Sequence, residues 1–395
     1  MQTNVGSPLR RPRRLLTVAH SYCVALNRRL AHEMARAGGG RWEVVAAAPE
    51  FFRGDLRPVK LEAFEGEASG LEGVPAYLSD RIHVMLYGRR LRELLRGGWD
   101  VVHCWEEPYI FAGAQVARWS PRGAALVYAT FQNIEKDYPP PFNWVERYSM
   151  GRSSGWIAFG HTAERALAHR PEYSSRARRV IPPGVDLEMF RPDGGLRREA
   201  LRRLGWAERG APVVGYLGRF VEQKGLRLLT RALSRLTSDW RALFVGSGPL
   251  EAELRRWAGG WGDRVRISTG VRHDEVPAYL NAMDVLCAPS QTTPAWREQL
   301  GRMLIEAFAC GVPVVASDSG EIPFVVGDAG VVVGERDEDG WARAVGELLE
   351  SPGRRAELAG RGLERARAVY AWPRVARQHL DFFEEVLEER PGAAA

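Results

Sequence analysis

Short apolar runs alternate with amphipathic helical segments along most of this chain. In the first half a helix is predicted over 27–37, and strands are predicted at 15–19, 42–47, 101–103, 125–130 and 156–159. In the second half a long last helix is predicted over 372–389, and strands are predicted at 212–217, 241–245, 265–268, 285–288, 312–316 and 331–333. Strands that alternate with helices form β–α–β units, because neighbouring parallel strands need a crossover connection. The sequence therefore predicts an α/β fold built on parallel sheets.

The chain has 395 residues, more than one hydrophobic core usually holds, so two domains are expected. No apolar run reaches the length that spans a membrane, and the four cysteines form no C-x-x-C pair. A reducing, cytoplasmic location is therefore expected. The basic residues between Arg10 and Arg14 faintly mimic the start of a signal peptide, but a first strand over 15–19 is the better interpretation.

Two glutamates, Glu298 and Glu306, stand eight residues apart across the opening of a predicted helix. Eight helical positions make two turns plus about 80°, so both carboxylates can face one side. Between them, Leu300, Gly301 and Arg302 fall where first-turn N–H groups lack intrahelical partners, and such an end attracts phosphate. One carboxylate can then bond a sugar ring and the other a ribose, with a diphosphate between them. The spacing alone also fits a surface helix with two solvated glutamates.

A glycine-bounded loop, from Gly218 to Gly225, follows the predicted strand at 212–217. It carries Arg219, which can grip phosphate with two parallel hydrogen bonds, and Lys224, which adds a compact charge. The chain holds 55 lysines and arginines, and only Lys60, Lys136 and Lys224 among them are lysines. A lysine in this loop therefore points to a specific role, although two solvated loop cations would look the same.

These segments resemble the retaining glycosyltransferases of family 4, which have the two-domain GT-B fold. The family carries a Glu-x7-Glu motif followed by a small-residue helix and a Gly-x-Pro-Val-Val strand, and here Glu298, Glu306 and 311–315 match it. Three further blocks match in the same order, at 181–190, 215–225 and 284–290. The resemblance is strong over 180–390 and faint over 1–180.

The resemblance implies two Rossmann-like domains whose parallel sheets face a cleft. The expected boundaries are 1–185 for an acceptor-binding domain, 186–371 for a donor-binding domain, and 372–395 for a C-terminal helix that crosses back to the first domain. The implied reaction moves a sugar from a nucleoside-diphosphate sugar to an acceptor hydroxyl, with retention of the anomeric configuration. Polysaccharide or glycolipid synthesis is the expected setting.

The resemblance also implies roles for the side chains of the donor site. Arg219 and Lys224 would stabilise the departing diphosphate, Glu298 would bond hydroxyls of the donor sugar, and Glu306 would bond the ribose. Neither a metal nor another cofactor is expected, because the two cations take the place of a metal and no suitable Asp-x-Asp or histidine spacing occurs.

Backbone groups complete the expected donor site. Gly218 belongs to the diphosphate loop, and the N–H groups of Leu300, Gly301 and Arg302 face the phosphates. Val271, at the end of the strand 265–268, is expected to meet the base through its backbone.

The first half departs from the family. Many members carry a glycine pair after the first strand, where this chain has His20-Ser-Tyr-Cys-Val24. Many also carry a histidine where this chain reads Ala-Thr-Phe-Gln-Asn at 129–133, and an amide cannot act as a base. Strand-end positions offer four other candidates, each also explained as a capping or surface residue: His103, His161, Glu106 and Glu107. An aromatic platform for a sugar face, or core packing, is open for Tyr22, Tyr109, Tyr138, Phe142 and Trp144.

The expected partners are the donor and a carbohydrate or lipid-linked acceptor. The net charge of +6 fits peripheral contact with an anionic membrane surface, whereas no motif for nucleic acid occurs. Two other functions stay open: a GT-B sugar-nucleotide epimerase, and a non-catalytic nucleotide-binding partner protein. An NAD-dependent oxidoreductase is disfavoured, because Gly246-Ser-Gly248 lacks the third glycine of a dinucleotide fingerprint.

Overall fold

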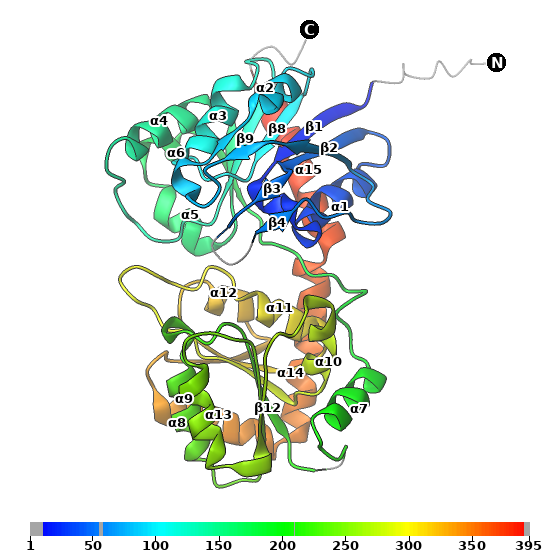
Figure 1. The fold of residues 1–395 in the computed structure, drawn as a ribbon, viewed down its shortest axis with the longest axis vertical. Helices are drawn as coiled ribbons and strands as arrows, with labels where there is room; N and C mark the ends of the chain where they lie inside the picture. The colour runs from blue at the N-terminus through cyan, green and yellow to red at the C-terminus, as the bar shows by residue number, and fades with distance from the viewer. Residues whose placement is uncertain (1–10, 55–57, 209, 391–395) are drawn as a thin grey trace, which may run out of the picture.

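The computed structural model describes residues 11–54, 58–208 and 210–390, and each half of the chain builds its own parallel sheet (Figure 1). The first sheet has seven strands in the order β11-β10-β9-β8-β1-β2-β5, and every pairing is parallel. Its strands are β1 (Arg13–Val18), β2 (Trp42–Pro49), β5 (Gly70–Val74), β8 (Val101–Cys104), β9 (Ala125–Thr130), β10 (Gly155–Ala158) and β11 (Ala177–Val180).

The second sheet has six parallel strands in the order β14-β13-β12-β15-β16-β17. They are β12 (Val213–Leu217), β13 (Arg241–Val245), β14 (Val265–Ser268), β15 (Val285–Ala288), β16 (Val314–Ser317) and β17 (Gly330–Val333). The strand order reverses between β12 and β15, and ligands of such sheets bind at the carboxyl ends of the strands beside the reversal. The prediction of an α/β fold with two parallel sheets is confirmed.

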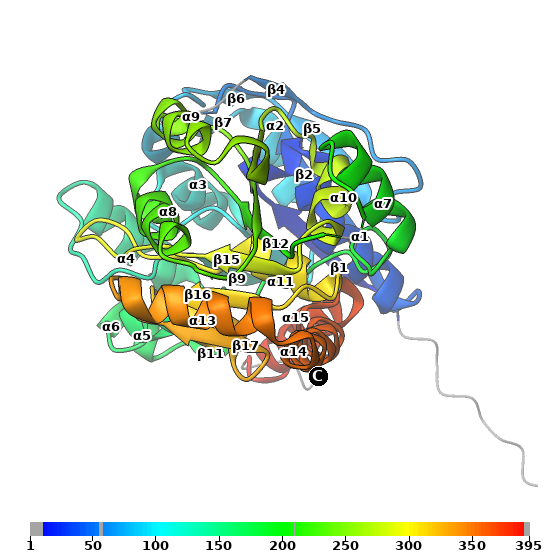
Figure 2. The ribbon, with the colours of Figure 1, turned by 90° about the horizontal axis from the view of Figure 1, so that it is seen from below.

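Helices cover the faces of both sheets. Those of the first half are α1 (Arg29–Gly38), α2 (Arg89–Leu95), α3 (Phe111–Trp119), α4 (Phe142–Arg152), α5 (His161–Leu167) and α6 (Pro171–Ser174). Those of the second half are α7 (Gly194–Arg203), α8 (Leu226–Ser234), α9 (Glu251–Gly259), α10 (Val276–Asn281), α11 (Arg302–Ala309), α12 (Ile322–Val326), α13 (Glu338–Glu350) and α14 (Pro352–Arg365). Figure 2 shows α13 running beside β16 and β17. No helix within the described ranges is long and apolar enough to cross a membrane.

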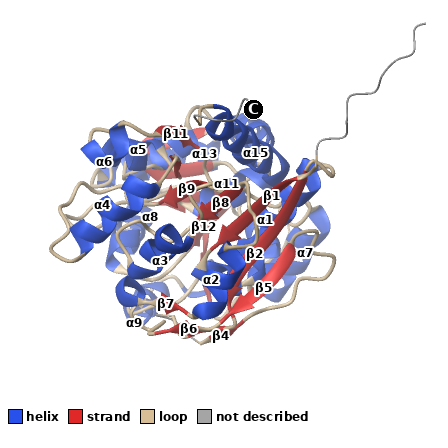
Figure 3. Cartoon of the chain, turned by 90° about the horizontal axis from the view of Figure 1, so that it is seen from above, coloured by secondary structure: helices blue, strands red, loops and turns tan. Residues whose placement is uncertain are grey.

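The last helix, α15 (Trp372–Glu388), leaves the second half and packs on the first. It lies against α1 near β1 in the view of Figure 3. Its buried residues Val375, Leu380 and Phe383 share one core cluster with Leu15 of β1 and Val127 of β9. The predicted crossing of the C-terminal helix is therefore confirmed, although residues 391–395 lie outside the described part of the chain.

Two short hairpins stand outside the main sheets: β3 (Phe51–Phe52) with β4 (Val59–Lys60), and β6 (Ala76–Tyr77) with β7 (Leu86–Tyr87). The sequence patterns predicted neither hairpin, nor the strands β5 and β11. They placed β16 two residues early, because Gly311 adopts a left-handed φ of 69° and Pro313 has no N–H to donate to the sheet.

Candidate functional site

A cleft of about 430 Å³ lies between the two halves, and the second half lines it with the run predicted from the sequence, residues 298–302. The first half lines it with His20, Ser21, Asn27, Ile82, Trp105, Glu107, Tyr109, Ile110 and Phe131, and the connections add Pro183 and Trp372. The cleft therefore places the glutamate motif of the donor side opposite a wall that carries the rings of Trp105, Tyr109 and Phe131.

Helix α11 begins at this cleft. Gly301 is its N-cap and has a left-handed φ of 75°, a conformation that costs other residues free energy. A Cβ atom at Gly301 would also lie 2.9 Å from Leu304 Cδ1. The first-turn N–H groups of a helix lack intrahelical partners and carry partial positive charge. The glycine thus places an anion-attracting helix end at the cleft wall.

The carboxylate of Glu298 forms an ion pair with Lys224 and accepts a hydrogen bond of 2.8 Å from the Ser290 hydroxyl. Its backbone carbonyl accepts the N–H of Glu321 at 2.9 Å and the amide of Asn133, from the first half, at 3.1 Å. Lys224 also lies 5.1 Å from the centre of the Trp296 ring. Two residues 74 positions apart in the sequence, both predicted for the donor site, are therefore in direct contact.

The loop that carries Lys224 packs on the loop that follows β15. Gly225 has a left-handed φ of 69°, and a Cβ atom there would lie 1.8 Å from the carbonyl oxygen of Pro289. A Cβ atom at Gly246, which follows β13, would lie 1.9 Å from the carbonyl oxygen of Gly218. Arg219 is exposed at the surface of the loop. In the described part of the chain, neither Arg219 nor Gly218 lines the 430 Å³ cleft.

Glu306 is 6% exposed and lies 3.4 Å from Nε2 of His273. His273 and Val271 line a second hollow between the halves, of about 770 Å³, opposite residues 24–26 of the first half. His273 therefore connects Glu306, predicted to bind the ribose, with the hollow that is lined by Val271, predicted to contact the base. Sequence reasoning missed His273, although its place just after β14 marks it as a strand-end residue.

Two of the four first-half candidates are structural. His103 is fully buried, accepts the indole N–H of Trp105 at 3.0 Å and lies 3.2 Å from the Thr17 hydroxyl. Burial lowers its pKa well below the usual value. Glu106 is also fully buried, and it accepts the backbone N–H of His20 at 2.5 Å and the hydroxyl of Tyr87. Neither residue lines the cleft, so the suggestion that they act on an acceptor is not supported.

Glu107 is the first-half carboxylate that does line the cleft. One oxygen accepts the Thr130 hydroxyl at 2.6 Å, and the other accepts the Phe131 N–H at 2.8 Å. Burial raises its pKa to about 7, against the opposing effect of these two donors. Beside it, the ring of Tyr109 stacks on Tyr138 with centroids 4.0 Å apart. The predicted aromatic platform is therefore present only in part: Tyr109 reaches the cleft, whereas Tyr22, Phe142 and Trp144 do not line it.

His161, the fourth candidate, joins the two halves. Glu321 of the second half is 3% exposed and accepts the backbone N–H groups of His161 and Thr162, each at 2.7 Å. It also accepts the Thr162 hydroxyl at 2.6 Å. Glu321 belongs to the motif region of the sequence, yet its role as a cap for α5 could not be read there, because its partners lie 160 positions away.

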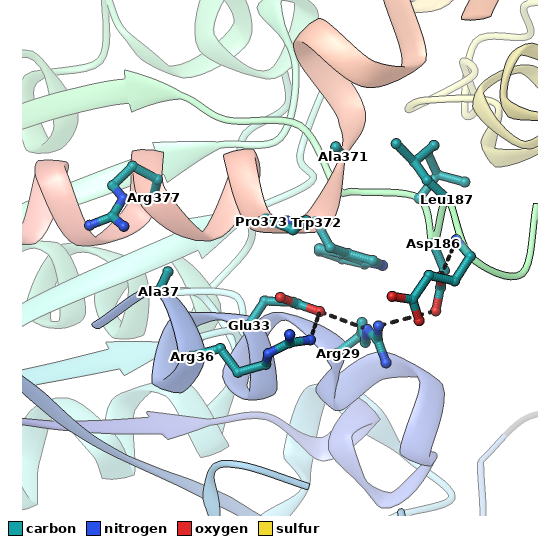
Figure 4. A pocket seen from close by; sticks show the side chains of 12 residues that line it. Arg29, Glu33, Arg36, Ala37, Asp186, Leu187, Ala371, Trp372, Pro373 and Arg377 are labelled. Carbon is teal, nitrogen blue, oxygen red and sulfur yellow. Dashed lines mark hydrogen bonds and ion pairs between the residues drawn. The ribbon is translucent and has the colours of Figure 1, made fainter. Parts of the chain in front are cut away.

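A third hollow, of about 450 Å³, lies where α1, the connection at 185–188 and the start of α15 meet (Figure 4). Arg29 stands between Glu33, at 3.1 Å, and Asp186, at 3.4 Å. A Cβ atom at Gly184 would lie 2.5 Å from the ring of Trp372. The two chain crossings between the halves are thus packed together and bound to α1.

Comparison with known proteins covers both halves. Residues 211–351 match the family described as glycosyl transferases group 1, and residues 26–189 match glycosyltransferase family 4. A GDP-mannose-dependent alpha-(1-6)-phosphatidylinositol monomannoside mannosyltransferase from Mycobacterium tuberculosis is 35% identical, over 71% of this chain and 76% of its own. Its counterpart from Mycolicibacterium smegmatis is 37% identical over 58% of each chain. A D-inositol 3-phosphate glycosyltransferase from Salinispora tropica is 36% identical over 74% and 62%.

Solved structures agree with the fold. Sucrose-phosphate synthase from Thermosynechococcus elongatus superposes with a TM-score of 0.70 at 22% identity, over 96% of this chain and 100% of its own. HepE from Anabaena, in complex with UDP, superposes with a TM-score of 0.71 at 18% identity, over 94% and 100%. These neighbours confirm the predicted fold class, and the sequence relatives confirm the resemblance on which it rested. The chain therefore belongs to family 4 of the glycosyltransferases and is a glycosyltransferase with the GT-B fold.

Proposed function

We propose that this protein transfers a sugar from a nucleoside-diphosphate sugar to an acceptor hydroxyl in glycolipid synthesis, with retention of the anomeric configuration. The observation that carries the proposal is the contact of Lys224 with Glu298 beside the N-terminus of α11. The carboxylate of Glu298 and a helix end with partial positive charge line the cleft, and the Lys224 cation, which does not line it, is held against Glu298. That set suits a donor with a sugar on one side and a diphosphate on the other.

In this proposal the diphosphate binds between Lys224 and the helix end at Gly301, and Arg219 folds onto it from the exposed loop. Glu298 bonds hydroxyls of the donor sugar, and Glu306 bonds the ribose. The N–H groups at Leu300 and Arg302 belong to the same helix end, while Gly218 and Val271 supply backbone contacts. Two cations and a helix end can stabilise the leaving group without a divalent metal.

The relatives named above favour GDP-mannose as the donor and a phosphatidylinositol mannoside as the acceptor. A lipid-linked acceptor would bring the protein to the inner face of a membrane as a peripheral, cytoplasmic enzyme, and the net charge of +6 supports such contact. Membership of a transferase family also favours transfer over the alternative of epimerisation.

Thermal-shift measurements with GDP, UDP and their sugars identify the donor, because a ligand that binds the native state raises its apparent stability. The stabilising donor is then incubated with a phosphatidylinositol mannoside, with and without excess EDTA. We expect a glycosylated lipid in both samples, and only slow release of nucleotide when the lipid is omitted. Binding of a donor without transfer to any acceptor would contradict a transferase, and loss of activity in EDTA that Mg²⁺ restores would contradict the metal-free mechanism.

A further inference from the structure

We propose that the first-half wall of the 430 Å³ cleft selects an uncharged sugar or polyol ring as the acceptor group, and that Glu107 holds one of its hydroxyls. This inference rests on the proposed transfer reaction and names the class of acceptor ring; in a phosphatidylinositol mannoside that ring is the uncharged mannosyl ring, not the inositol ring that carries the phosphate. It makes Glu107 a residue that determines specificity, not one that moves a proton in the reaction.

The aromatic part of the wall is held firmly in place. Trp105 packs edge-on against Phe159 with ring centroids 4.7 Å apart, and Phe131 stacks on the same ring at 3.9 Å. Tyr109 is fixed by its stack on Tyr138. Rigid aromatic rings lose little entropy on binding and offer apolar faces. Such faces suit the C–H side of a pyranose or cyclitol ring, whose hydroxyls then point to the rim.

The charged residues on this wall do not favour the binding of a phosphate group. Among the described residues that line the cleft from the first half, none is a lysine or an arginine. Lys136 does not line the cleft; it lies 5.0 Å from the centre of the Tyr138 ring and 6.0 Å from that of Tyr109. Arg302 lines the cleft from the second half, where it begins α11 on the donor side. A phosphorylated ring on the wall would therefore set its negative charge beside Glu107 without an arginine or lysine partner there.

The carboxylate of Glu107 retains capacity for a ligand. A carboxylate offers about four lone-pair sites, and the Thr130 hydroxyl and the Phe131 N–H use two of them. Sugar hydroxyls are donors that can use the others. Because the carbonyl of Phe131 accepts the side-chain amide of Gln299 at 3.0 Å, the segment that orients Glu107 is also tied to the donor motif. A hydroxyl held by Glu107 is thereby kept at a set place relative to Glu298.

The affinity for the acceptor ring should also depend on pH. The pKa of Glu107 is raised to about 7, mainly by burial; the charge of Glu146 also acts to raise it, and the hydrogen bonds from Thr130 and Phe131 and the charge of Lys136 act to lower it. Tyr109 and Tyr138 pack beside it, and Glu106 precedes it in the chain. The ionised carboxylate accepts hydroxyl hydrogen bonds more strongly than the acid does. Affinity for an uncharged ring should therefore rise as the pH increases through about 7, whereas affinity for a phosphorylated ring should fall.

The test uses calorimetric titration of the full chain, saturated with whichever of GDP or UDP stabilises it, at pH 6 and pH 8. The probes are methyl α-D-mannopyranoside, myo-inositol and D-inositol 3-phosphate. We expect at least one uncharged probe to bind, several-fold more tightly at pH 8, and roughly tenfold more weakly in Glu107→Gln. The phosphate of the third probe should give no gain over myo-inositol. Tyr109→Ala, which removes one ring of the wall, should also bind weakly.

Affinity for the nucleotide, which binds to the other half, checks that each variant is folded. The inference is overturned if D-inositol 3-phosphate binds tenfold more tightly than myo-inositol, if neither uncharged probe binds, or if Glu107→Gln leaves their dissociation constants unchanged. A failure of the proposed function looks different: the uncharged probes would bind through Glu107, yet no sugar would be transferred to any acceptor.

Discussion

Lys224 is the residue whose loss should slow the reaction most. In a transfer where the leaving phosphate itself accepts the acceptor's proton, the main demand is to stabilise charge on the diphosphate as the glycosidic bond breaks. Lys224→Ala should then lower kcat on the order of 10²-fold, the effect of losing one preorganised donor. Steady-state kinetics test this, with Lys60→Ala on the exposed strand β4 as the control.

The anomeric configuration of the first-formed product, followed by NMR, belongs to the same experiment. We expect the configuration of the donor. An inverted product, or a variant of Glu106 or Glu107 with a lower kcat than Lys224→Ala, would point instead to displacement assisted by a base in the first half.

Glu306 should contribute to nucleotide affinity rather than to the rate. Its side chain is nearly buried beside His273, where a ribose hydroxyl would find a charged acceptor. Glu306→Ala should weaken binding of the nucleoside diphosphate by roughly 1–3 kcal/mol, as measured by calorimetry. Glu364→Ala, on an exposed turn of α14, is the matched control. Equal affinities for the two variants would mean that Glu306 only packs on its helix.

Glu107 should also affect stability, with a definite sign. Its pKa rises from 4.5 to about 7 on folding, so the folded state binds its proton more tightly than the unfolded state does. The resulting stabilisation of the folded state is fully present below pH 4.5 and is lost as the pH rises through 7. The loss lowers the free energy of unfolding by up to about 3 kcal/mol. Glu107→Gln should remove this part of the dependence of the unfolding free energy on pH, as chemical unfolding at pH 5 and pH 8 will show. A slope equal to that of the unmodified protein would contradict the raised pKa.

Which of these residues the sequence can reveal depends on where their partners lie. Glu298, Gly301 and Glu306 stand within one short segment, so their spacing alone predicts a helix end flanked by carboxylates. His273 and Glu321 escape notice because they act through residues 33 and 160 positions away. The buried state of Glu106, which removes it from the cleft, is likewise set by Tyr87 and by His20, 86 positions away.

At the scale of an element, the N-terminus of α11 depends on one glycine. Gly301→Ala should cost about 1–2 kcal/mol of stability, because alanine is strained at a φ of 75° and its Cβ atom meets Leu304. It should also weaken binding of the nucleoside diphosphate, since relief of the strain moves the first-turn N–H groups. Gly259→Ala in α9 is the control, because nothing lies within 4 Å of a Cβ atom there. Equal stability and affinity in the two variants would contradict this role.

Strands of the second half were predicted well because they are short and mostly apolar, and a turn-forming residue follows soon after them: Gly246 after β13, Gly270 after β14 and Pro289 after β15. The predicted bounds of β13, β14 and β15 agree with the structure, as do those of β9. Helix α4 was missed because Trp144 and Tyr148, 62% and 42% exposed, disturb its amphipathic pattern and prolines precede it. The hairpin strands have only two residues each, so no periodic pattern marks them.

At the scale of the whole molecule, Glu321 should hold the two halves in register. Its carboxylate accepts the backbone N–H groups of His161 and Thr162 and the Thr162 hydroxyl, and it lies 3.1 Å from Nδ1 of His161. The N–H of Glu321 donates to the carbonyl of Glu298. Glu321→Ala should cost roughly 1–3 kcal/mol per unpaired group, lower Tm and raise the radius of gyration in small-angle scattering. Glu338→Ala, which breaks an ion pair with Arg231 inside the second half, should leave the radius unchanged. An unchanged radius in Glu321→Ala would mean that the halves are held elsewhere.

The crossing of α15 also has a consequence for biosynthesis. The last strand of the first sheet ends at Val180, and the helix that covers that sheet begins at Trp372, 192 residues later. At about 5–20 residues per second, the ribosome needs roughly 10–40 s to supply it. Throughout that interval the apolar face that receives Phe383 has no cover. We therefore expect chaperones to bind the nascent first half. A chain truncated before α15 should lose the folded structure of its first domain rather than that of its second.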